Sequence, residues 1–474
     1  MSAPTPDLAL AIARKVRDAG GRAVVVGGWV RDELAGRTPK DLDLEVFGVE
    51  SGKLKALLQS LGRVDTVGEH FAVHKIEGID VSLPRRESKT GRGHKGFTVE
   101  GDPALSFEDA ARRRDFTINA ISRDPLTSEV IDPFNGTNDL AARRLRIVDK
   151  ERFADDSLRV LRALQFVARF DLTADEETRA ILRAIPLDDL PSERVWGEVE
   201  KLLLVAEKPS IGFDLARDLN VVARLWPEMV PLVGCPQDPE WHPEGDVFVH
   251  TGHCCDALAT LPEWREADDD TRVVLMFAVL AHDFAKPMTT HEAEKDGRKR
   301  IVSPGHEEAG GPLALQFLER INAPIATRER VVPLVSNHLA HLQNLNDRAI
   351  RRLARRLAPE TIEHLCVVIT ADQFGRPPKP REISESVLAL RAGAEHLKLA
   401  AAAPRPILMG RHLIALGLEP GAEFGRILTA AFEAQMEGEF NDLGGALEWL
   451  EGRAALGLAV SKQAFARARE EFKL

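Results

Sequence analysis

The stretch VVVGGWVRDELAGRTPKDLDLEVFG, residues 24–48, holds the pattern that predicts the fold of the N-terminal part of the chain. Val24–Val26 form an apolar run typical of a buried strand. Gly27 and Gly28 predict a turn at which the backbone approaches a neighbouring group closely. Residues 29–34 predict the first turns of a helix. The segment DLDLEV then alternates charged and apolar residues, which is the period of a half-buried strand.

Acidic residues gather on one face of that second strand. With a period of two, Asp41, Asp43 and Glu45 point to the same side. Two carboxylates side by side on a rigid strand repel each other unless a cation lies between them, although an exposed polar face would give the same pattern. Asp80 lies in a further strand-like run, HKIEGIDVSLPR. Three strand carboxylates can hold two divalent cations, which can activate an attacking hydroxyl and stabilise the pyrophosphate that leaves a triphosphate.

Groups suited to phosphate lie close to these acids in the sequence. The glycine turn offers backbone N–H groups at the start of a helix, and Arg31 follows one turn later. The run RRRDFTINAI at 112–121 supplies Arg114 and Asp115. Arginine guanidinium groups suit a triphosphate, and a carboxylate can accept hydrogen bonds from ribose hydroxyls.

Composition limits the classes of protein that fit. A chain of 474 residues suits several domains, and 44% hydrophobic with 29% charged residues is typical of a soluble protein. The apolar run VVLMFAVLA at 273–281 is too short to span a bilayer. The four cysteines form no CxxC pair, which favours a reduced, cytoplasmic protein over a disulfide framework. The net charge of −11 argues against indiscriminate coating of nucleic acid but leaves room for local basic patches.

The densest basic patch, PRRESKTGRGHKGF at 84–97, follows the aspartate strands. A run of charge is usually a solvated surface. Because this run flanks the predicted phosphate site, we expect Arg85, Arg86 and Lys89 to contact the backbone of RNA.

Hydrophobic periodicity divides the chain into parts. Strands are predicted at 23–26, 41–47, 71–76 and 79–83, whereas almost every pattern beyond about residue 150 is helical. Pro- and Gly-rich segments lie at 230–246 and 374–382. We therefore expect an α+β fold, with a small mixed sheet and helices followed by all-helical parts. The predicted parts are residues 1–150, 151–235, 236–380 and 381–474.

The motifs GGWVRD, KDLDLEVFG, RRDFTINAI, DPFNGTNDL and LRVLRALQFVARF occur in an order and spacing that resembles the class II tRNA nucleotidyltransferases. That family comprises CCA-adding enzymes and bacterial poly(A) polymerases with a DNA-polymerase-β-like head. The resemblance covers residues 20–230. It implies a nucleotidyltransferase head at 1–150 and a helical, RNA-binding neck at 151–235.

The resemblance also implies roles for the acidic and basic residues. Asp41 and Asp43 would bind Mg²⁺, and Asp80 would activate the primer 3′-hydroxyl. Arg114 and Asp115 would contact the triphosphate and the ribose, beside the phosphate-binding Gly27, Gly28 and Arg31. Glu45 carries no role in the resemblance, and we expect it at the surface.

Selection of C and A would follow from a further pair. In the family an Asp and an Arg one helical turn apart, here Asp156 and Arg159, face the Watson–Crick edge of the incoming base. The carboxylate would accept from the exocyclic amine of C or A, and the guanidinium would donate to the ring nitrogen. U and G present the reverse pattern, which would leave both groups unpaired. The segment DDSLR departs from the family's usual Glu-Asp-Pro-Leu-Arg at Asp155 and Ser157.

A second group of candidate residues lies in the histidine-rich part. An adjacent His-Asp pair in LAHDFAKP, with outlying His and Asp residues, suits a transition-metal site. The set resembles the HD phosphohydrolase domain that is fused to some bacterial CCA-adding enzymes, here at 236–380. The ligands implied by this resemblance are His250, His282, Asp283 and Asp372, with His306 and His338 as the extra ligands of two-metal variants. We expect phosphodiesterase or phosphatase activity there, and structural roles for His253, His341 and His364.

Residues 381–474 resemble the helical tail that grips tRNA in the fused enzymes. Together these features predict a cytoplasmic, Mg²⁺-dependent enzyme that adds C and A to tRNA from CTP and ATP, without a membrane partner. The HD domain would hold a divalent transition metal of unspecified identity, and a homo-oligomer is compatible with the sequence.

The alternatives are a poly(A) polymerase, a partial CC- or A-adding enzyme, an HD phosphohydrolase whose head only binds RNA, and a non-catalytic tRNA-binding protein. The intact Asp41, Asp43 and Asp80 argue against the last two.

Overall fold

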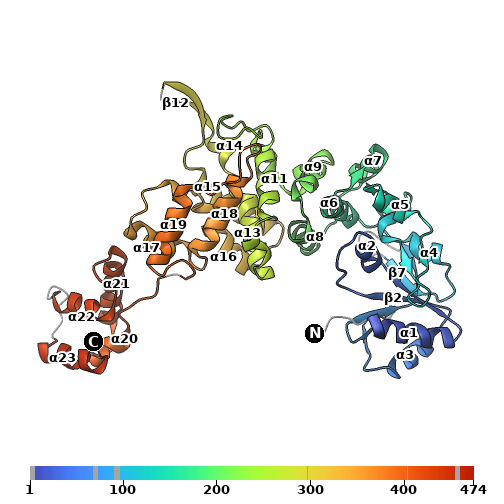
Figure 1. Cartoon of the computed structure of the whole chain (residues 1–474), viewed down its shortest axis with the longest axis horizontal. Helices are drawn as coiled ribbons and strands as arrows, with labels where there is room; N and C mark the ends of the chain where they lie inside the picture. The colour runs from blue at the N-terminus through green and yellow to red at the C-terminus, as the bar shows by residue number, and fades with distance from the viewer. Residues whose placement is uncertain are drawn as a thin grey trace. The chain divides into compact units, whose positions relative to one another are not determined.

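The computed structural model describes residues 6–67, 73–89, 97–295, 297–402, 404–453 and 460–473, and of residues 87–89 and 97–99 it describes the backbone alone. The chain divides into two units (Figure 1). The first unit is Met1–Val230 with Arg320–Asn322, and the second is Pro231–Glu319 with Ala323–Leu474. The finer division into four parts stays a prediction.

A seven-stranded mixed sheet forms the N-terminal part of the first unit, with the strand order β3-β4-β5-β2-β1-β8-β9. Its strands are β1 (Arg22–Val26), β2 (Asp43–Phe47), β3 (Asp65–Val67), β4 (Val73–Ile76), β5 (Ile79–Ser82), β8 (Ser122–Arg123) and β9 (Val130–Ile131). β2 pairs with β5 in parallel, and the remaining neighbours are antiparallel. The sequence-based strands at 23–26 and 79–83 are confirmed, as is the described part of 71–76, whereas the strand predicted at 41–47 begins only at Asp43.

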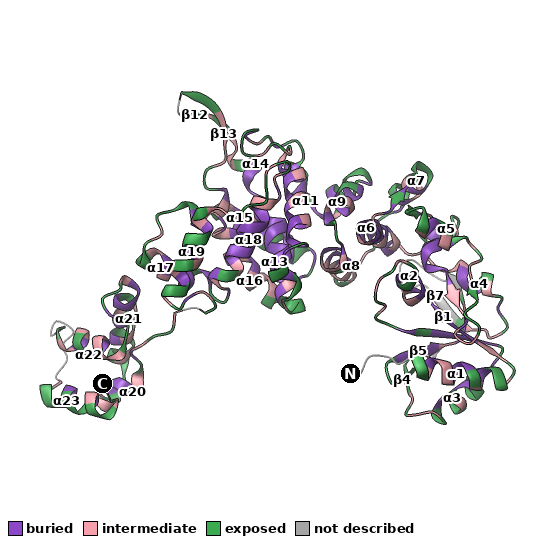
Figure 2. Ribbon diagram, in the orientation of Figure 1, coloured by how far each residue is buried: buried purple, intermediate pink, exposed green. Residues whose placement is uncertain are grey.

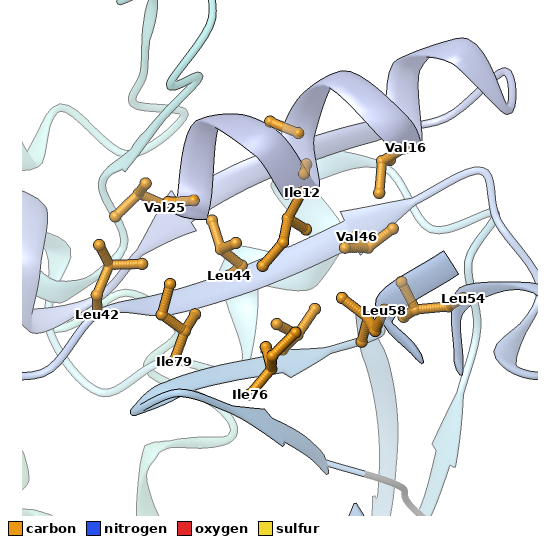
Figure 3. Close-up of a cluster of buried hydrophobic side chains, with 14 of the residues drawn as sticks. Ile12, Val16, Val25, Leu42, Leu44, Val46, Leu54, Leu58, Ile76 and Ile79 are labelled. Atoms are coloured by element: carbon orange, nitrogen blue, oxygen red, sulfur yellow. The ribbon is translucent and has the colours of Figure 1, made fainter. Parts of the chain in front are cut away.

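Helices α1 (Pro6–Asp18) and α3 (Ser51–Gln59) cover one face of this sheet. Figure 3 shows their apolar side chains meeting those of β2, where Leu44 and Val46 point into the same cluster as Ile12. Leu44 is fully buried, so it contributes the full transfer term of about 1.5–3 kcal/mol. The alternation along β2 therefore sends the acidic side chains of its first residues to the opposite face.

The opposite face of β1 is covered in part by α4 (Phe107–Arg112), where Val24, Val26 and Phe47 contact Ala110. Helix α2 (Gly28–Leu34) begins directly after β1, as the glycine turn predicts. These contacts leave the first residue of β2 at the edge of the covered area, and Asp43 is exposed there.

The rest of the first unit is mostly helical, with α6 (Leu158–Phe170) packed against α8 (Ser192–Val205) and α9 (Pro209–Asp218). Its other elements are β6 (Arg85–Lys89), β7 (Phe97–Gly101), η1 (Thr117–Asn119), α5 (Gly136–Ala141), β10 (Arg144–Leu145), η2 (Phe153–Asp155), β11 (Thr173–Ala174), α7 (Glu176–Ala184), α10 (Val221–Leu225) and η3 (Pro227–Leu232).

The second unit is built on a helical bundle whose central helices, α13 and α18, are largely buried (Figure 2). The helices are α11 (Val247–Leu258), α12 (Pro262–Arg265), α13 (Asp269–Ala281), α14 (Lys286–Thr289), α15 (His306–Arg320), α16 (Ile325–Ser336), η4 (Ala340–Leu342), α17 (Asp347–Leu357), α18 (Ile362–Phe374), α19 (Glu385–His396), α20 (Gly410–Ala415), α21 (Ala422–Glu437), α22 (Leu443–Glu451) and α23 (Lys462–Glu471). The apolar run at 273–281 is the buried centre of α13. Among the helices of the described residues, none combines the length and the apolar character that crossing a bilayer requires.

A β-hairpin interrupts this helical region, where the sequence predicts helix. Strands β12 (His291–Lys295) and β13 (Arg298–Val302) pair in antiparallel register. Gly297, at the turn between them, has a φ of 71°, a conformation that glycine adopts without strain. The Asp-Gly pair at 296–297 is a common hairpin signal, and it was available in the sequence.

Candidate active sites

The pairing of β2 with β5 brings two of the predicted catalytic carboxylates together. Asp43 and Asp80 are direct partners in the parallel register. Asp41 lies two residues before Asp43 on the segment that leads into β2, and its side chain is also exposed. Although Asp43 reaches solvent, desolvation by the surrounding protein, together with the neighbouring charge of Asp80, raises its pKa to about 6. Lys75 is the nearest counter-ion of Asp80, with its Nζ 3.1 Å from Oδ2.

The set of carboxylates formed by Asp41, Asp43 and Asp80 fits a hard divalent cation. Mg²⁺ prefers oxygen ligands and is commonly held by one or two carboxylates together with substrate phosphates. The pKa of Asp43 is raised first by desolvation and then by the neighbouring carboxylates of Asp80 and Asp41, effects that a bound cation would offset. The residues present at the start of β2 and on β5 therefore match the Mg²⁺ that the sequence predicts.

The glycine turn brings Arg114 against the backbone. Gly27 has a φ of 70°, and a Cβ placed on it would lie 3.0 Å from Nη1 of Arg114. A side chain at residue 27 would therefore strain the backbone and crowd the guanidinium. Burial lowers the pKa of Arg114, with the nearby Arg113 acting in the same direction. The turn thus holds a half-buried cation beside Asp43.

A cleft of about 480 Å³ connects these residues with the helical part of the first unit. Seven basic and three acidic side chains line it, an excess of positive charge that suits a polyphosphate. Its lining is Gly27, Gly28, Arg31, Asp43, Arg114, Asp115, Asn119, Asp156, Leu158, Arg159, Arg162, Gln165, Phe166, Arg169, Arg194 and Lys201. Asp41 and Asp80 are not part of this lining.

Asp115 is held in place by three donors. Its Oδ1 accepts from the backbone N–H of Phe116 and from Nδ2 of Asn119, both at 2.8 Å. Its Oδ2 accepts from Nε of Arg162 at 2.6 Å. Burial alone would raise the pKa of Asp115, but the charge of Arg162 and the hydrogen bonds keep it below its usual value. Asp115 is therefore an ionised, oriented carboxylate in the cleft.

Arg31 braces α2 against α6. Its Nη1 donates to Oδ1 of Asn119 at 2.5 Å, and its Nη2 donates to Oδ1 of Asp32 at 2.7 Å. The guanidinium carbon also lies 5.1 Å and 4.7 Å from the ring centroids of Phe166 and Phe170. Arg31 therefore borders the cleft with much of its donor capacity already committed to the protein.

The structure corrects the expected arrangement of Asp156 and Arg159. Asp156 is extended and precedes α6, so the two residues do not share one helix face. The carboxylate of Asp156 accepts from the first-turn N–H of Leu158 at 3.1 Å and from Nη2 of Arg194 at 3.1 Å. The guanidinium of Arg159 donates to the carbonyl of Arg113 at 2.8 Å. Both residues nevertheless line the cleft, and base reading by this pair stays a prediction.

The expectation that Glu45 lies at the surface is wrong. Glu45 is 3% exposed, and its Oε1 accepts from Nη2 of Arg113 at 2.7 Å. The period of two gives the face of the strand correctly, but the segment after α4 covers that face. Glu45 thereby anchors Arg113, whose carbonyl in turn holds Arg159.

The predicted RNA-binding residues lie on the hairpin β6–β7. Arg86 is exposed, and its Nε donates to Oδ2 of Asp102 at 2.8 Å. The side chain of Lys89, and the whole of residues 90–96, fall outside the described residues. RNA contact by Arg85, Arg86 and Lys89 stays a prediction.

In the second unit, all six predicted metal ligands come together from different elements. His250 lies on α11, His282 and Asp283 follow α13, His306 begins α15, His338 follows α16 and Asp372 lies on α18. We call these six residues the His–Asp cluster. All six are buried, with exposed fractions of 5% or less.

Asp283 lies at the centre of the His–Asp cluster. Its Oδ2 is 3.2 Å from Nε2 of His282 and 3.6 Å from Nε2 of His250. Its Oδ1 is 3.2 Å from Nε2 of His306 and 3.9 Å from Nε2 of His338. One carboxylate therefore faces two groups of imidazoles, as expected of a ligand that bridges two cations.

The imidazoles are oriented with Nε2 toward the centre. In each case Nδ1 contacts an acceptor: the carbonyl of Val279 for His282, of Ser303 for His306 and of Val335 for His338, and Oε1 of Glu244 for His250. Such bonds fix the tautomer that leaves Nε2 free to bind a metal. Burial and the neighbouring imidazoles lower the pKa of His338 to about 3, which keeps this ring neutral.

Within the described residues, Nε2 of His282 makes no hydrogen bond of good geometry, although Asp283 lies close to it. An orphaned, buried nitrogen beside a carboxylate fits a transition metal, for which imidazole and carboxylate are ordinary ligands. The His–Asp cluster therefore matches the metal that the sequence predicts there.

A cavity of about 800 Å³ opens onto the His–Asp cluster. Lys286 extends into it, with its Nζ 2.7 Å from Oδ2 of Asp283 and 2.7 Å from Oε1 of Gln237. Arg376 donates to Asp372 at 2.7 Å. The cavity thus offers cations beside the ligand group, which suits a phosphate ester. His341 also lines it, although the sequence suggests a purely structural role.

Comparisons with known proteins match the N-terminal part of the chain and, separately, most of its length. Residues 23–146 match the family model described as the poly A polymerase head domain. A protein from Xanthomonas oryzae pv. oryzae, named Multifunctional CCA protein, is 36% identical over 422 residues, which is 86% of this chain and 96% of that protein. The chain belongs to the multifunctional CCA protein family. A member from Stenotrophomonas maltophilia is 35% identical over 367 residues, covering 74% of this chain and 86% of its own.

Solved CCA-adding enzymes share the fold of this family member. The Bacillus stearothermophilus enzyme, solved in complex with CTP, aligns with a TM-score of 0.63 at 19% identity, over 99% of this chain and 98% of its own. The Thermotoga maritima enzyme, solved with tRNA, aligns with a TM-score of 0.57 at 19% identity, over 94% of both chains. The predicted α+β fold, with a nucleotidyltransferase head and helical body, is thereby confirmed.

Several site residues of this CCA family member were missed at the sequence level. Arg162 and Gln165 follow Arg159 at intervals of three on α6, and that spacing was a usable signal. Arg194 and Lys201 come from α8, which the sequence gives no reason to place at the cleft. In the second unit, Glu244 and Cys254 lie beside His250 and were likewise missed. Cys254 follows His250 by four residues on α11, which was a usable signal, whereas the position of Glu244 depends on tertiary packing.

Proposed function

We propose that this chain adds C and A nucleotides to the 3′ end of tRNA, using CTP and ATP without a nucleic acid template. The observation that carries the proposal is the register pairing of Asp43 with Asp80 beside a cleft rich in basic side chains. Membership of the multifunctional CCA protein family supports the choice of tRNA as substrate. So do the related enzymes that were solved with CTP and with tRNA.

The residues of the cleft would divide the work as follows. When bound, Mg²⁺ would activate the 3′-hydroxyl and stabilise the leaving pyrophosphate. Asp41 and Asp43 would hold it, and Asp80 would orient the hydroxyl and accept its proton. Arg114 would neutralise triphosphate oxygens beside the glycine turn, against which it already lies. Preorganised charge of this kind costs little reorganisation during the reaction.

Base selection would need an exchange of partners in the cleft. Asp156 is bound by Arg194, and Arg159 by the carbonyl of Arg113. An incoming C or A would compete for these groups with its amine and ring nitrogen, whereas U and G could satisfy neither. Ser157, one of the two departures from the family's usual motif, donates to Oδ1 of Asp189 at 2.7 Å.

The test is to incubate the full-length protein with tRNA that ends before CCA, with each nucleoside triphosphate singly and in combination, and then to sequence the 3′ ends. Addition of C, C and A in order supports the proposal. Runs of A would identify a poly(A) polymerase, and arrest after CC, or addition only to tRNA ending in CC, would identify a partial enzyme. Asp43→Ala is the inactive control.

We further infer that the second unit hydrolyses phosphate esters at the His–Asp cluster. The observation behind this is Asp283 between two groups of inward-facing imidazoles, with Lys286 beside it. Divalent cations held there would supply a hydroxide nucleophile near neutral pH. Lys286 and Arg376 would bind the phosphoryl oxygens.

Hydrolysis and nucleotide addition should be separable. Asp283→Ala should abolish metal-dependent hydrolysis of a phosphomonoester or a 2′,3′-cyclic nucleotide and leave nucleotide addition intact. Asp43→Ala should do the reverse. Loss of both activities in folded Asp283→Ala protein would contradict two independent sites.

The free, buried state of all four cysteines supports a reducing, cytoplasmic location.

A further inference from the structure

Gln165 is a buried amide side chain on the wall of the cleft in the first unit. It lies on α6 among buried apolar residues and is 4% exposed, yet it belongs to the lining of the cleft. Within the described residues, no side chain or backbone group makes a hydrogen bond with its amide. Because buried polar groups normally have a partner, this amide is available to a molecule that enters the cleft.

The second amide of the cleft lining, Asn119, contrasts with Gln165. Oδ1 of Asn119 accepts from Nη1 of Arg31 at 2.5 Å, and its Nδ2 donates to Oδ1 of Asp115 at 2.8 Å. Asn119 is therefore occupied at both ends of its amide. Of the two amide side chains in the described lining, Gln165 is the one that can still bind a ligand.

Asp115, the predicted ribose-binding carboxylate, has limited capacity left for the sugar. A carboxylate offers about four positions for hydrogen-bond donors. Asp115 fills three of them, with the backbone N–H of Phe116, Nδ2 of Asn119 and Nε of Arg162. One position remains, whereas a ribose with free 2′- and 3′-hydroxyl groups needs an acceptor for each. The second hydroxyl therefore requires a different partner in the cleft.

The other acidic side chains of the described lining have different tasks. Asp43 belongs to the carboxylates that would hold Mg²⁺, and the carboxylate of Asp156 is bound by Arg194. The remaining charged side chains of the lining are arginines and a lysine, which donate but cannot accept. Oε1 of Gln165 is thus the side-chain acceptor that remains for a second hydroxyl. Its Nε2 can also donate, which suits a hydroxyl oxygen.

The order of residues along α6 places Gln165 beside the expected ribose position. Arg162, which holds Asp115, precedes Gln165 by three residues. Residues three apart on a helix are neighbours, with their Cβ atoms about 5–6 Å apart. Arg159, which is expected to face the base, lies one further turn toward the start of the helix. A ribose bonded to Asp115 would therefore lie next to the amide of Gln165.

We propose that the amide of Gln165 binds the ribose hydroxyl of the incoming nucleotide that Asp115 leaves unpaired. It would thereby help the cleft to select ribonucleotides over deoxynucleotides. A nucleotide that lacks this hydroxyl would leave a buried amide without a partner, and such a loss is what makes a binding site reject an analogue. The inference rests on the proposed binding of nucleotides in the cleft, but not on tRNA as the acceptor of the nucleotide.

The test compares CTP, 2′-deoxy-CTP and 3′-deoxy-CTP in single-turnover addition to tRNA that ends before CCA. Gln165→Met removes the amide and keeps an unbranched side chain with high helix propensity. This variant should use CTP about two- to tenfold less efficiently, the usual worth of a neutral hydrogen bond. It should use one of the two analogues, the one without the bound hydroxyl, as well as the unmodified protein does. Gln59→Met, the same change at an exposed residue of α3, is the matched control and should alter none of the three rates.

Two outcomes would overturn the assignment. Equal losses with all three nucleotides would mean that Gln165 contacts another part of the nucleotide or only supports the fold. Unchanged rates with all three would mean that it contacts no part of the nucleotide. Because the amide makes no hydrogen bond within the described residues, Gln165→Met should also keep the urea unfolding midpoint of the unmodified protein. A lowered midpoint together with equal losses would identify a purely structural residue.

Equilibrium binding separates this inference from the proposed function. Calorimetric titration of the full-length protein with CTP and the two analogues, in the presence of Mg²⁺ and without tRNA, requires nucleotide binding alone. If the unmodified protein binds CTP but adds nothing to tRNA, nucleotide addition fails as the function. The ratios of affinities in Gln165→Met then still decide the role of Gln165. If the unmodified protein binds no nucleoside triphosphate, both the function and this inference are wrong.

Discussion

Replacing Arg162 by Ala should loosen the segment that carries Asp115, because the charge that keeps this buried carboxylate ionised would be lost. The side chain of Asp115 is 7% exposed and that of Arg162 is 33% exposed, with Nε and Oδ2 2.6 Å apart. Breaking a fully buried ion pair costs about 3–5 kcal/mol. Because Arg162 is partly solvated, we expect Arg162→Ala to lower the free energy of unfolding by about 2–3 kcal/mol. This lies between the cost of breaking a buried pair and the roughly 0–1 kcal/mol of a surface pair.

The loss of stability in Arg162→Ala should depend on pH and be smaller in acid. In the unmodified protein the pKa of Asp115 lies below its usual value, so its contribution to stability is present above the unfolded pKa of about 3.9 and lost below the folded one. In Arg162→Ala, burial raises the pKa of this carboxyl without a compensating cation. Asp115 would then protonate at a higher pH than before. The difference in stability between the two proteins should therefore be greatest at neutral pH and shrink as the pH falls.

The assay is urea unfolding followed by pulse labelling with deuterium and peptide mass spectrometry, which reports the first unit separately. In the absence of urea, a stability loss of about 2–3 kcal/mol makes the equilibrium constant for opening about 30- to 150-fold larger. This increase should appear in the peptides spanning 113–121 and 158–170. Lys150→Ala, which removes an exposed pair with Glu177, is the control and should change little. Equal stability of Arg162→Ala and the unmodified chain, or a penalty that grows on acidification, would refute the reasoning.

Three further changes test the cleft and its surroundings. Asp43→Ala should abolish nucleotide addition while tRNA binding, measured by filter retention, persists; addition near the normal rate would remove the metal-binding assignment. Asp156→Ala should reduce the use of CTP and ATP by about ten- to a hundredfold, since a hydrogen-bonded base contact is worth about 1–3 kcal/mol. In single-turnover assays UTP and GTP should become relatively less disfavoured, and an unchanged four-base preference would place base reading elsewhere. Neutralising Arg85, Arg86 and Lys89 should flatten the dependence of RNA affinity on salt concentration, because fewer counterions are released. An unchanged slope would show that these residues are solvated and do not contact RNA.

Most local elements of this protein, and the kinds of residue at its sites, could be predicted from the sequence. The strands around Val24 and Leu44, the glycine turn and the acidic alternation were predictable because period and turn chemistry are local properties. The order of the motifs indicated the family, and the resemblance to the HD phosphohydrolase domain named all six residues of the His–Asp cluster. The hairpin at 291–302 was missed, although its Asp-Gly pair was there to be used.

Which of these residues meet, and what surrounds them, depends on tertiary packing. Alternation puts Asp43 and Glu45 on one face, but the segment after α4 covers Glu45 and leaves Asp43 open. The pairing of Asp43 with Asp80 depends on the register of two strands that are separated by a helix and a hairpin. Burial and distance arise from contacts between elements far apart in the chain, and no local period encodes them.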